Sequence, residues 1–296
     1  MKLQFTKMHS LGNDFVLIDD RSEKLEQLPQ LAIKLCDRRF GIGADQLLLM
    51  RHSLIADFNM RIFNADGSEV EMCGNGIRCL GQYIWHEILR SRTTQKNKLF
   101  IDTIAIETLA GIKHLKKTGS LIEVDMGEPV LEAEKISVET GQRAKGEGRR
   151  VKNAEQGVIN YPLKINGKIF KITCVSMGNP HAVIVVKDVM KVPLENYGPV
   201  IENNKIFPKR TNVEFIQILD RRNIKMRVWE RGAGETMACG TGASASAVAS
   251  ALLGLTGRKV TVHLPGGKLQ IDWPAKDNHV FMTGDAVKVF DGIIEL

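Results

Sequence analysis

Two glycine-rich turns, each presenting a cysteine ahead of a helical pattern, constrain this chain more than any other feature. Residues 66–76 read DGSEVEMCGNG, and residues 234–242 read GETMACGTG. Cys73 and Cys239 therefore each precede a segment whose apolar residues suit a helix. The repetition predicts two similar halves, with one cysteine at the N-terminus of the main helix of each half.

The residues around the first turn predict a mixture of strands and a helix. Turn-forming residues at 10–13 separate two short apolar runs, and residues 57–63 alternate with period two. After Cys73, four apolar side chains fall at helical spacing: Ile77, Leu80, Ile84 and Ile88. We expect strands at 3–8, 15–19, 46–50 and 57–63, and helices at about 27–37 and after Cys73.

The second half repeats this order of elements. Residues 243–255 are almost wholly apolar and small, and a helix that is apolar on all faces is normally buried. We expect strands at 169–175, 182–186, 213–219 and 224–230 before this helix, and at 259–264, 268–273, 279–284 and 286–290 after it.

These patterns predict an α+β fold of two pseudo-symmetric halves, each a curved, barrel-like β-sheet around a central helix. The expected active site lies in the cleft between the halves. The N-terminal half covers residues 1–130, carries Cys73 and is completed by a C-terminal strand at about 285–296. The C-terminal half covers residues 131–284 and carries Cys239.

Composition places the chain among ordinary globular proteins. It has 296 residues, 43% hydrophobic and 25% charged, which is enough for two medium domains. Its five cysteines are an odd number, so no disulfide framework is implied. The first residues, MKLQF, do not resemble a secretory leader, and no apolar run approaches the roughly 18 residues of a membrane span. We expect a cytoplasmic protein.

A net charge of +7 and a pI near 9.1 raise the hypothesis of a nucleic-acid partner. Much of the excess lies at residues 90–98 and 141–152, which read as solvated loops and lack interleaved aromatic residues for base stacking. We therefore expect no nucleic-acid partner and no membrane association. Positive potential that attracts an anionic or zwitterionic substrate is the milder interpretation.

A cysteine at a helix N-terminus meets unpaired backbone N–H groups and the positive end of the helix dipole, which favour its thiolate. Flanking glycines let the same N–H groups approach a carboxylate. Two such thiols could face one substrate from opposite sides, as a cofactor-independent inversion of a carbon centre requires. The alternative is that both cysteines are small buried residues that only pack against the start of a helix. One cysteine turn alone would favour this packing role, whereas two matching turns favour the catalytic role.

The other cysteines, Cys36, Cys79 and Cys174, lack such a position, and we expect them in the core. No zinc site is expected, because neither C-x-x-C nor H-E-x-x-H spacing occurs.

Several polar residues are candidates for substrate binding. Asn13, Asn64, Asn179 and Asn212 could each donate to and accept from an amino acid, although a lone asparagine is more often a turn residue. From its position alone, His181 is more simply interpreted as a histidine at the edge of a strand, with no functional role. Arg231 could bind a carboxylate, or it could form a surface ion pair with Glu230.

Six stretches together resemble the diaminopimelate epimerases, in order and along the whole chain: KMHSLGNDFVLID, RRFGIGADQLLL, FNADGSEVEMCGNGIRC, SMGNPHAV, RTNVEFIQ and WERGAGETMACGTGASASA. That family shares its fold group with proline racemases and isomerase-like phenazine biosynthesis proteins. The basic stretches near 91–98 and 141–156 look like insertions relative to shorter members.

The resemblance implies that Cys73 and Cys239 are the catalytic acid/base pair. It implies that His181 and Glu230 tune the cysteines and that Arg231 binds the distal carboxylate of the substrate. The implied substrate-binding residues are Asn13, Gln46, Asn64, Gly74, Asn75, Asn179, Asn212, Glu230, Arg231, Gly240 and Thr241.

The resemblance also implies the reaction. LL-2,6-diaminopimelate would be converted to the meso isomer, for lysine and peptidoglycan precursor synthesis, without pyridoxal phosphate or metal and in a homodimer. Two alternatives stay open: a racemase of another amino acid such as proline, and a protein that binds nucleic acid or another partner.

Overall fold

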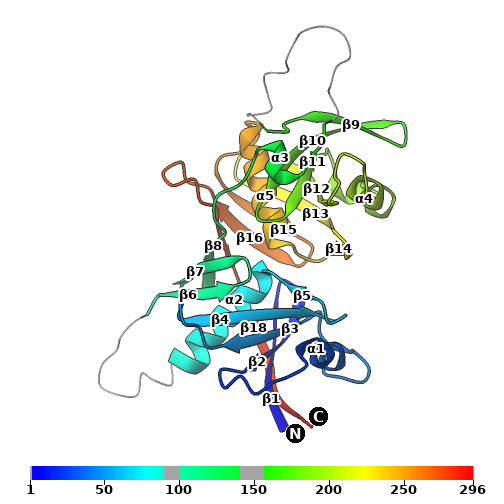
Figure 1. Cartoon of the computed structure of the whole chain (residues 1–296). Coiled ribbons are helices and arrows are strands. Elements are labelled where there is room, and N and C mark those ends of the chain that lie inside the picture. The colour runs from blue at the N-terminus through cyan, green and yellow to red at the C-terminus, as the bar shows by residue number, and fades with distance from the viewer. Residues whose placement is uncertain (1, 90–100, 141–156, 296) are drawn as a thin grey trace. The chain divides into compact units, whose positions relative to one another are not determined.

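The computed structural model describes residues 2–89, 101–140 and 157–295 (Figure 1). It divides into two compact units. The first unit comprises Met1–Asp125 with Thr283–Leu296, and the second comprises Met126–Met282. The basic stretches predicted at 90–98 and 141–152 lie outside the described residues.

The first unit is built on one mixed sheet. Its strands are β1 (Lys2–Ser10), β2 (Asn13–Asp19), β3 (Gln46–Arg51), β4 (Phe58–Asn64), β5 (Glu69–Val70), β6 (Thr103–Thr108), β7 (Gly111–Thr118), β8 (Leu121–Asp125) and β18 (Val287–Glu295). β1 pairs antiparallel with β18 and β2, β2 runs parallel to β3, and β3 is antiparallel to β4. β4 then pairs with β5 and, in parallel, with β6, from which β7 and β8 continue antiparallel.

The central helix of this unit is α2 (Gly74–Tyr83), followed by a π-helical segment, η1 (Ile84–Leu89). α2 contacts β1, β2, β3, β4, β8 and β18, so the sheet curves around it (Figure 1). A second helix, α1 (Leu28–Cys36), has Pro29 in its first turn, where a missing N–H costs no hydrogen bond.

The strands of the second unit also pair in a mixture of parallel and antiparallel contacts. Its strands are β9 (Tyr161–Ile165), β10 (Lys168–Ser176), β11 (Pro180–Val185), β12 (Asn212–Asp220), β13 (Asn223–Glu230), β14 (Gly234–Thr236), β15 (Lys259–Leu264) and β16 (Gly267–Asp272), and β17 (Phe281–Gly284) contains the boundary between the units. β9, β10 and β11 are successively antiparallel, and β11 runs parallel to β12. β12 is antiparallel to β13, which pairs with β14 and, in parallel, with β15.

The central helix of the second unit is α5 (Gly240–Leu252), which contacts β10, β11, β12, β13, β15 and β16. Its small apolar residues are buried on all sides, as the sequence predicted. The remaining helices of the described residues are α3 (Ala133–Ile136), η3 (Val189–Lys191) and α4 (Leu194–Glu202).

The two units repeat one topology. In each, an antiparallel pair (β1–β2 or β10–β11) leads through a helix to a parallel neighbour, β3 or β12. An antiparallel strand follows, β4 or β13, with a short partner, β5 or β14, before the cysteine and the central helix. The predicted α+β fold, with a sheet around a central helix in each half, is confirmed.

Candidate active site

Cys73 is the N-cap residue of α2. Its backbone is extended, and its Sγ accepts a hydrogen bond from the backbone N–H of Gly76 at 3.5 Å. The thiol also lies 3.8 Å from Oδ1 of Asn13, a hydrogen-bond acceptor. The side chain is half-buried at a helix N-terminus, where backbone N–H groups favour negative charge on sulfur.

Polar side chains connect Cys73 to the interior of the first unit. Nδ2 of Asn75 donates to Oδ1 of Asn13 at 3.3 Å, and the guanidinium of Arg78 donates to Oδ1 of Asn75 at 2.7 Å. Arg78 is fully buried, which is rare for an arginine. Sequence reasoning missed this residue.

Gln46 and Asn64 form a second polar pair in this unit. Nε2 of Gln46 donates to Oδ1 of Asn64 at 2.8 Å, and Nδ2 of Asn64 donates to Ser68 Oγ at 2.9 Å. Among the described residues, the buried Oε1 of Gln46 has no hydrogen-bond partner. A buried acceptor of this kind suits a ligand donor such as an ammonium group.

Cys239 occupies the matching place in the second unit, as the N-cap residue of α5. It is only 4% exposed, and its Sγ lies 3.5 Å from Oγ1 of Thr241. Burial, together with the carboxylates of Glu230 and Glu214, raises the pKa of this thiol well above its ordinary value.

His181 lies within hydrogen-bonding distance of a buried carboxylate in the second unit. Its Nδ1 is 2.7 Å from Oε1 of Glu214, and both side chains are 0% exposed. Its Nε2 is 2.9 Å from Oδ1 of Asn179, whose Nδ2 donates to Thr241 Oγ1 at 3.3 Å. The strand-edge interpretation of His181 is wrong, because β11 pairs with β10 on one side and β12 on the other.

Glu230, Arg231 and Asn212 lie near one another at the ends of β13 and β12. Oδ1 of Asn212 accepts a hydrogen bond from the backbone N–H of Arg231 at 2.9 Å, and Oε1 of Glu230 accepts one from Thr236 Oγ1 at 2.5 Å. Burial raises the pKa of Glu230, against the opposing effect of its hydrogen bonds to Thr236 and Cys239. The exposed Arg231 guanidinium donates to the Lys209 carbonyl at 3.2 Å.

The structure thus gathers the predicted residues into sets within each unit. The first unit joins Asn13, Cys73 and Asn75, with Gly74 opening α2, and separately pairs Gln46 with Asn64. The second unit joins Cys239, Thr241, Asn179 and His181, with Gly240 opening α5, and links Asn212 to Arg231.

The remaining cysteines are buried and free, as expected. Burial raises the pKa of Cys36 to about 12 and raises those of Cys79 and Cys174 further. Over the described part of the chain, no cluster of three or more His, Cys, Asp or Glu side chains is arranged to hold a metal ion. No helix in the same residues is long and apolar enough to cross a membrane.

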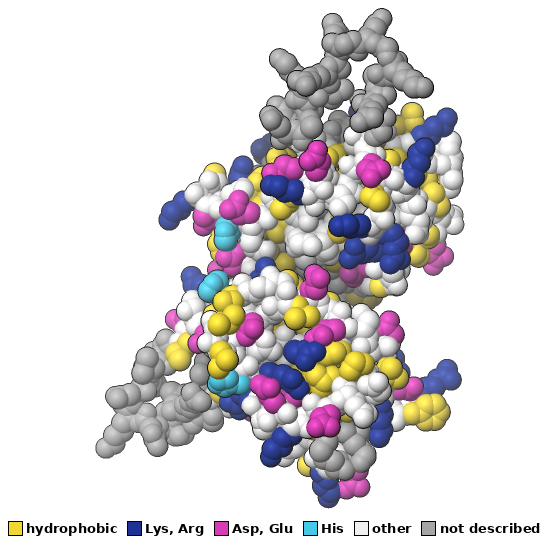
Figure 2. Space-filling view, in the orientation of Figure 1, with side chains coloured by type: hydrophobic (Ala, Val, Ile, Leu, Met, Phe, Trp, Pro, Cys, Tyr) yellow, Lys and Arg dark blue, Asp and Glu magenta, His cyan; other side chains and the backbone are white. Residues whose placement is uncertain are grey.

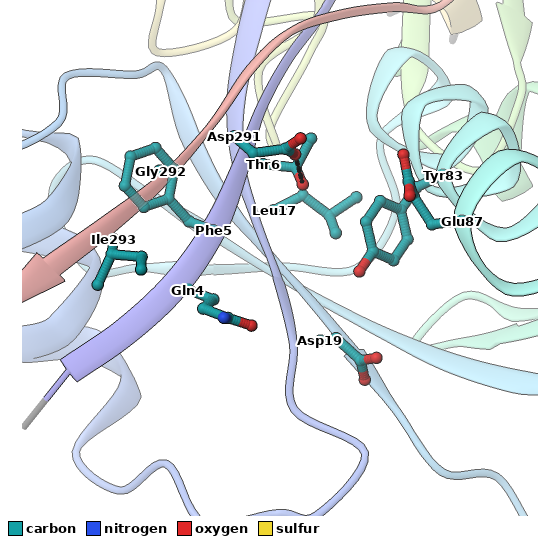
Figure 3. A pocket seen from close by; sticks show the side chains of 10 residues that line it. All are labelled: Gln4, Phe5, Thr6, Leu17, Asp19, Tyr83, Glu87, Asp291, Gly292 and Ile293. Carbon is teal, nitrogen blue, oxygen red and sulfur yellow. Dashed lines mark hydrogen bonds between the residues drawn. The ribbon is translucent and has the colours of Figure 1, made fainter.

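A pocket of about 580 Å³ lies elsewhere on the first unit (Figure 3). It is lined by residues of β1, β2 and β18 and of the helical segment that ends in η1, with Tyr83 and Glu87 opposite Thr6 and Asp291. Thr6 Oγ1 donates to Asp291 Oδ1 at 2.8 Å across one side of it. None of its lining residues is a predicted site residue.

Basic and acidic side chains are interspersed over the face of each unit shown in Figure 2. Several arginines have acidic partners, such as Arg61 with Glu69 and Arg227 with Glu235.

Solved structures with the same fold come from several groups. A phenazine biosynthesis protein of the PhzF family from Bacillus anthracis aligns with a TM-score of 0.67 at 16% identity over 100% of both chains. A hydroxyproline epimerase from Agrobacterium vitis, with bound trans-4-hydroxy-L-proline, has a TM-score of 0.67 at 12% identity, covering 99% of this chain and 92% of that one. At these identities the likeness shows the fold alone.

Sequence comparisons are more specific. The family model described as diaminopimelate epimerase matches residues 5–132 and 173–289. The chain is 50% identical to a diaminopimelate epimerase from Acetivibrio thermocellus over 99% of both chains, and 51% identical to one from Moorella thermoacetica over 98% of both. A diaminopimelate epimerase from Methanococcus maripaludis is 47% identical over 99% of this chain and 100% of its own. The chain therefore belongs to the diaminopimelate epimerase family.

Proposed function

We propose that this isomerase interconverts LL-2,6-diaminopimelate and meso-diaminopimelate, supplying lysine and peptidoglycan precursor synthesis. The observation that carries the proposal is the matched pair of cysteines, each the N-cap of a central helix in a repeated topology. Relatives that are about half identical over nearly their whole length are diaminopimelate epimerases. In this proposal the two units act as the two halves of the enzyme, each with one reacting cysteine.

The proposed mechanism uses one thiolate to remove the α-proton and the other thiol to return a proton to the opposite face. Each thiol is the base for one isomer and the acid for the other. An α-proton is far less acidic than a thiol, so the barrier must fall through preorganised donors around the substrate carboxylate. The helix starts supply such donors at Gly74 and Asn75 and at Gly240 and Thr241, where backbone N–H groups have no intrahelical partner.

The other site residues complete substrate recognition in this proposal. Arg231 binds the distal carboxylate, since its guanidinium is exposed and forms only a carbonyl contact among those described. Oε1 of Gln46 accepts from a substrate ammonium group. His181 and Glu230 tune the cysteines, and the amides complete the pocket: Asn13, Asn64, Asn179 and Asn212. Neither pyridoxal phosphate nor a metal ion takes part.

The test supplies purified, reduced protein with LL-diaminopimelate or with trans-4-hydroxy-L-proline and follows the products by chiral chromatography. We expect meso-diaminopimelate to form and hydroxyproline to stay unchanged. Replacing Arg231 by Met should raise KM for diaminopimelate roughly ten- to a hundredfold, because a charged hydrogen bond to the distal carboxylate is lost. Arg222→Met, a second exposed arginine in the turn after β12, is the matched control. If the protein instead epimerises hydroxyproline, and Arg231→Met does not change the rate, the proline-type alternative is correct.

We also propose that the enzyme is a homodimer in the cytoplasm. Strand β18 exposes the apolar side chains of Val289, Phe290 and Ile293 by 54%, 48% and 63%, and a second copy would cover part of this surface. All five cysteines are free thiols, which suits a reducing compartment. Light scattering should give twice the chain mass, and Ile293→Lys should yield monomer; a wild-type protein of single-chain mass would refute the dimer.

A further inference from the structure

Helix α4 packs against the end of β13, the strand that leads into Glu230 and Arg231. A Cβ added to Gly198 would lie 2.5 Å from Cγ of Trp229, so the helix backbone lies directly on the indole ring. Glu202 follows four residues later on the same face of the helix, and its Oε2 accepts the indole N–H of Trp229 at 2.8 Å. α4 therefore holds the end of β13 by a close backbone contact and by a hydrogen bond.

Glu202 also binds the turn that follows β13. Its Oε1 accepts the backbone N–H of Gly232 at 2.9 Å and a guanidinium N–H of Arg210 at 3.2 Å. The side chain of Glu202 is only 7% exposed, and these donors together with Trp229 use both of its oxygens. A carboxylate this deeply buried is costly unless it keeps such partners.

The position of Glu202 is unfavourable in two respects. It is the last residue of α4, where the partial negative charge of the helix end disfavours a carboxylate. Its partner Arg210 has a φ of 58°, in the left-handed region that residues other than glycine rarely adopt. Unfavourable features that meet in one contact indicate that the contact is retained for function.

The contact joins two segments that carry substrate-binding residues of the proposed function. One segment precedes β12 and ends at Asn212, and the other follows β13 and contains Arg231. Oδ1 of Asn212 accepts the backbone N–H of Arg231 at 2.9 Å, and the Arg231 guanidinium donates to the Lys209 carbonyl at 3.2 Å. Glu202 binds both segments, because one of its donors lies in each of them.

We propose that Glu202 is a positioning residue that holds the turn bearing Arg231, and thereby sets the selectivity of the enzyme for substrates with a second carboxylate. This inference rests on the proposed function, in which Arg231 binds the distal carboxylate. Glu202 acts through Arg231 rather than by touching the substrate. A guanidinium that starts from a fixed backbone loses less conformational entropy when it binds its ligand.

Glutamine is the discriminating substitution at this position. A carboxylate only accepts hydrogen bonds, whereas an amide has one accepting oxygen and one donating nitrogen. In Glu202→Gln the new NH₂ must face a donor, either the Trp229 indole or the Gly232 N–H. We expect KM for LL-diaminopimelate to rise about tenfold while kcat changes less than about twofold, because the loss affects binding of a group remote from the reacting carbon.

Glu195→Gln is the matched control. Glu195 is an exposed carboxylate in the first turn of the same helix, so its replacement makes the same chemical change away from the Arg231 turn. Its KM and kcat should equal those of the wild type. A purely structural role of Glu202 would lower the amount of folded enzyme, and with it the apparent kcat, without moving KM.

A double-mutant cycle separates an effect that passes through Arg231 from a general one. In an Arg231→Met background, Glu202→Gln should change KM less than about twofold, because the side chain that it positions is already gone. Arg210→Met removes a half-exposed partner of Glu202 and should raise KM several-fold, again only while Arg231 is present. This variant decides the question if Glu202→Gln does not fold.

Amide hydrogen exchange examines the turn without substrate or turnover. The Gly232 N–H should exchange at least about tenfold faster in Glu202→Gln than in the wild type, and at the wild-type rate in Glu195→Gln.

An unchanged KM or an unchanged Gly232 exchange rate in folded Glu202→Gln would overturn the proposal. A rise in KM that persists in the Arg231→Met background would also overturn it. If the wild type fails to convert LL-diaminopimelate, the proposed function is wrong instead, and the exchange measurement does not depend on that outcome.

Discussion

Glu230 is held in surroundings that disfavour its ionised form. Its folded pKa lies above the ordinary 4.5, chiefly because of burial. For a carboxyl group with a raised pKa, the contribution to stability is fully present below the unfolded pKa and is lost as pH rises through the folded pKa. Near neutral pH, ionised Glu230 therefore makes the folded protein less stable than it is below the unfolded pKa. This cost suits a residue that is retained for catalysis.

Glu230→Gln should mimic the neutral carboxyl. We expect the variant to melt above the wild type near neutral pH and at nearly the same temperature below the unfolded pKa, while kcat falls. Scanning calorimetry across this pH range checks the expectation. Glu132→Gln is the control of opposite sign, because the hydrogen bond from Lys135 lowers the pKa of Glu132. A melting difference for Glu230→Gln that does not change with pH would contradict the account.

Sequence reasoning identified both N-cap cysteines, since a Cys-Gly turn ahead of a helical pattern is a local signal. It assigned Cys36, Cys79 and Cys174 to the core, which the structure confirms. It missed Glu214, because the carboxylate meets His181, 33 residues away, only through the parallel pairing of β11 and β12. It missed Arg78 because an arginine within a helix normally points to solvent.

The start of α5 depends on a glycine with no room for a side chain. In α5, a Cβ on Gly242 would lie 2.7 Å from Glu214 Oε1 and 3.3 Å from Cys239 Sγ. Both neighbours are buried and held by hydrogen bonds, so neither can give way cheaply.

Gly242→Ala should therefore destabilise the protein by about 1–3 kcal/mol, as overpacked sites do, and should lower kcat more than it raises KM. Gly257→Ala is the matched control, since its added Cβ would meet only the Arg221 carbonyl, at 3.7 Å. Urea unfolding and steady-state kinetics measure the two quantities. If Gly242→Ala and Gly257→Ala change the free energy of unfolding and kcat by the same amounts, the close packing at Gly242 contributes to neither stability nor turnover.

The strands with clear turn signals were predicted at nearly their observed places, including β3, β4, β12, β13 and β15. The second central helix begins at Gly240, three residues before the predicted start, because the cysteine turn itself caps it. Helix α4 went unpredicted, since it contains Gly198 and Pro199, which sequence rules treat as helix breakers. The meander β6–β8 was left unassigned, although alternate residues of β6 and β8 are buried.

At the scale of the whole molecule, one topology occurs twice and carries two cysteine sites with different buried polar side chains, Arg78 in the first unit and Glu214 with His181 in the second. The repeat could be predicted because the two cysteine turns have similar sequences. The difference between these buried side chains could not be predicted, because it depends on which residues the sheet places behind each helix start. A repeated scaffold with one cysteine in each unit suits a reaction in which one thiolate takes a proton and the other thiol gives one.

The most direct test of the two-base account is proton NMR with LL- or meso-diaminopimelate in deuterated water. Wild-type enzyme should convert each isomer into the other and replace the α-proton with deuterium. Cys73→Ala and Cys239→Ala should each abolish conversion, because the remaining thiol serves only one face of the carbon. If either single-cysteine variant keeps wild-type conversion, or the wild type inverts the centre without taking up deuterium, the account is wrong.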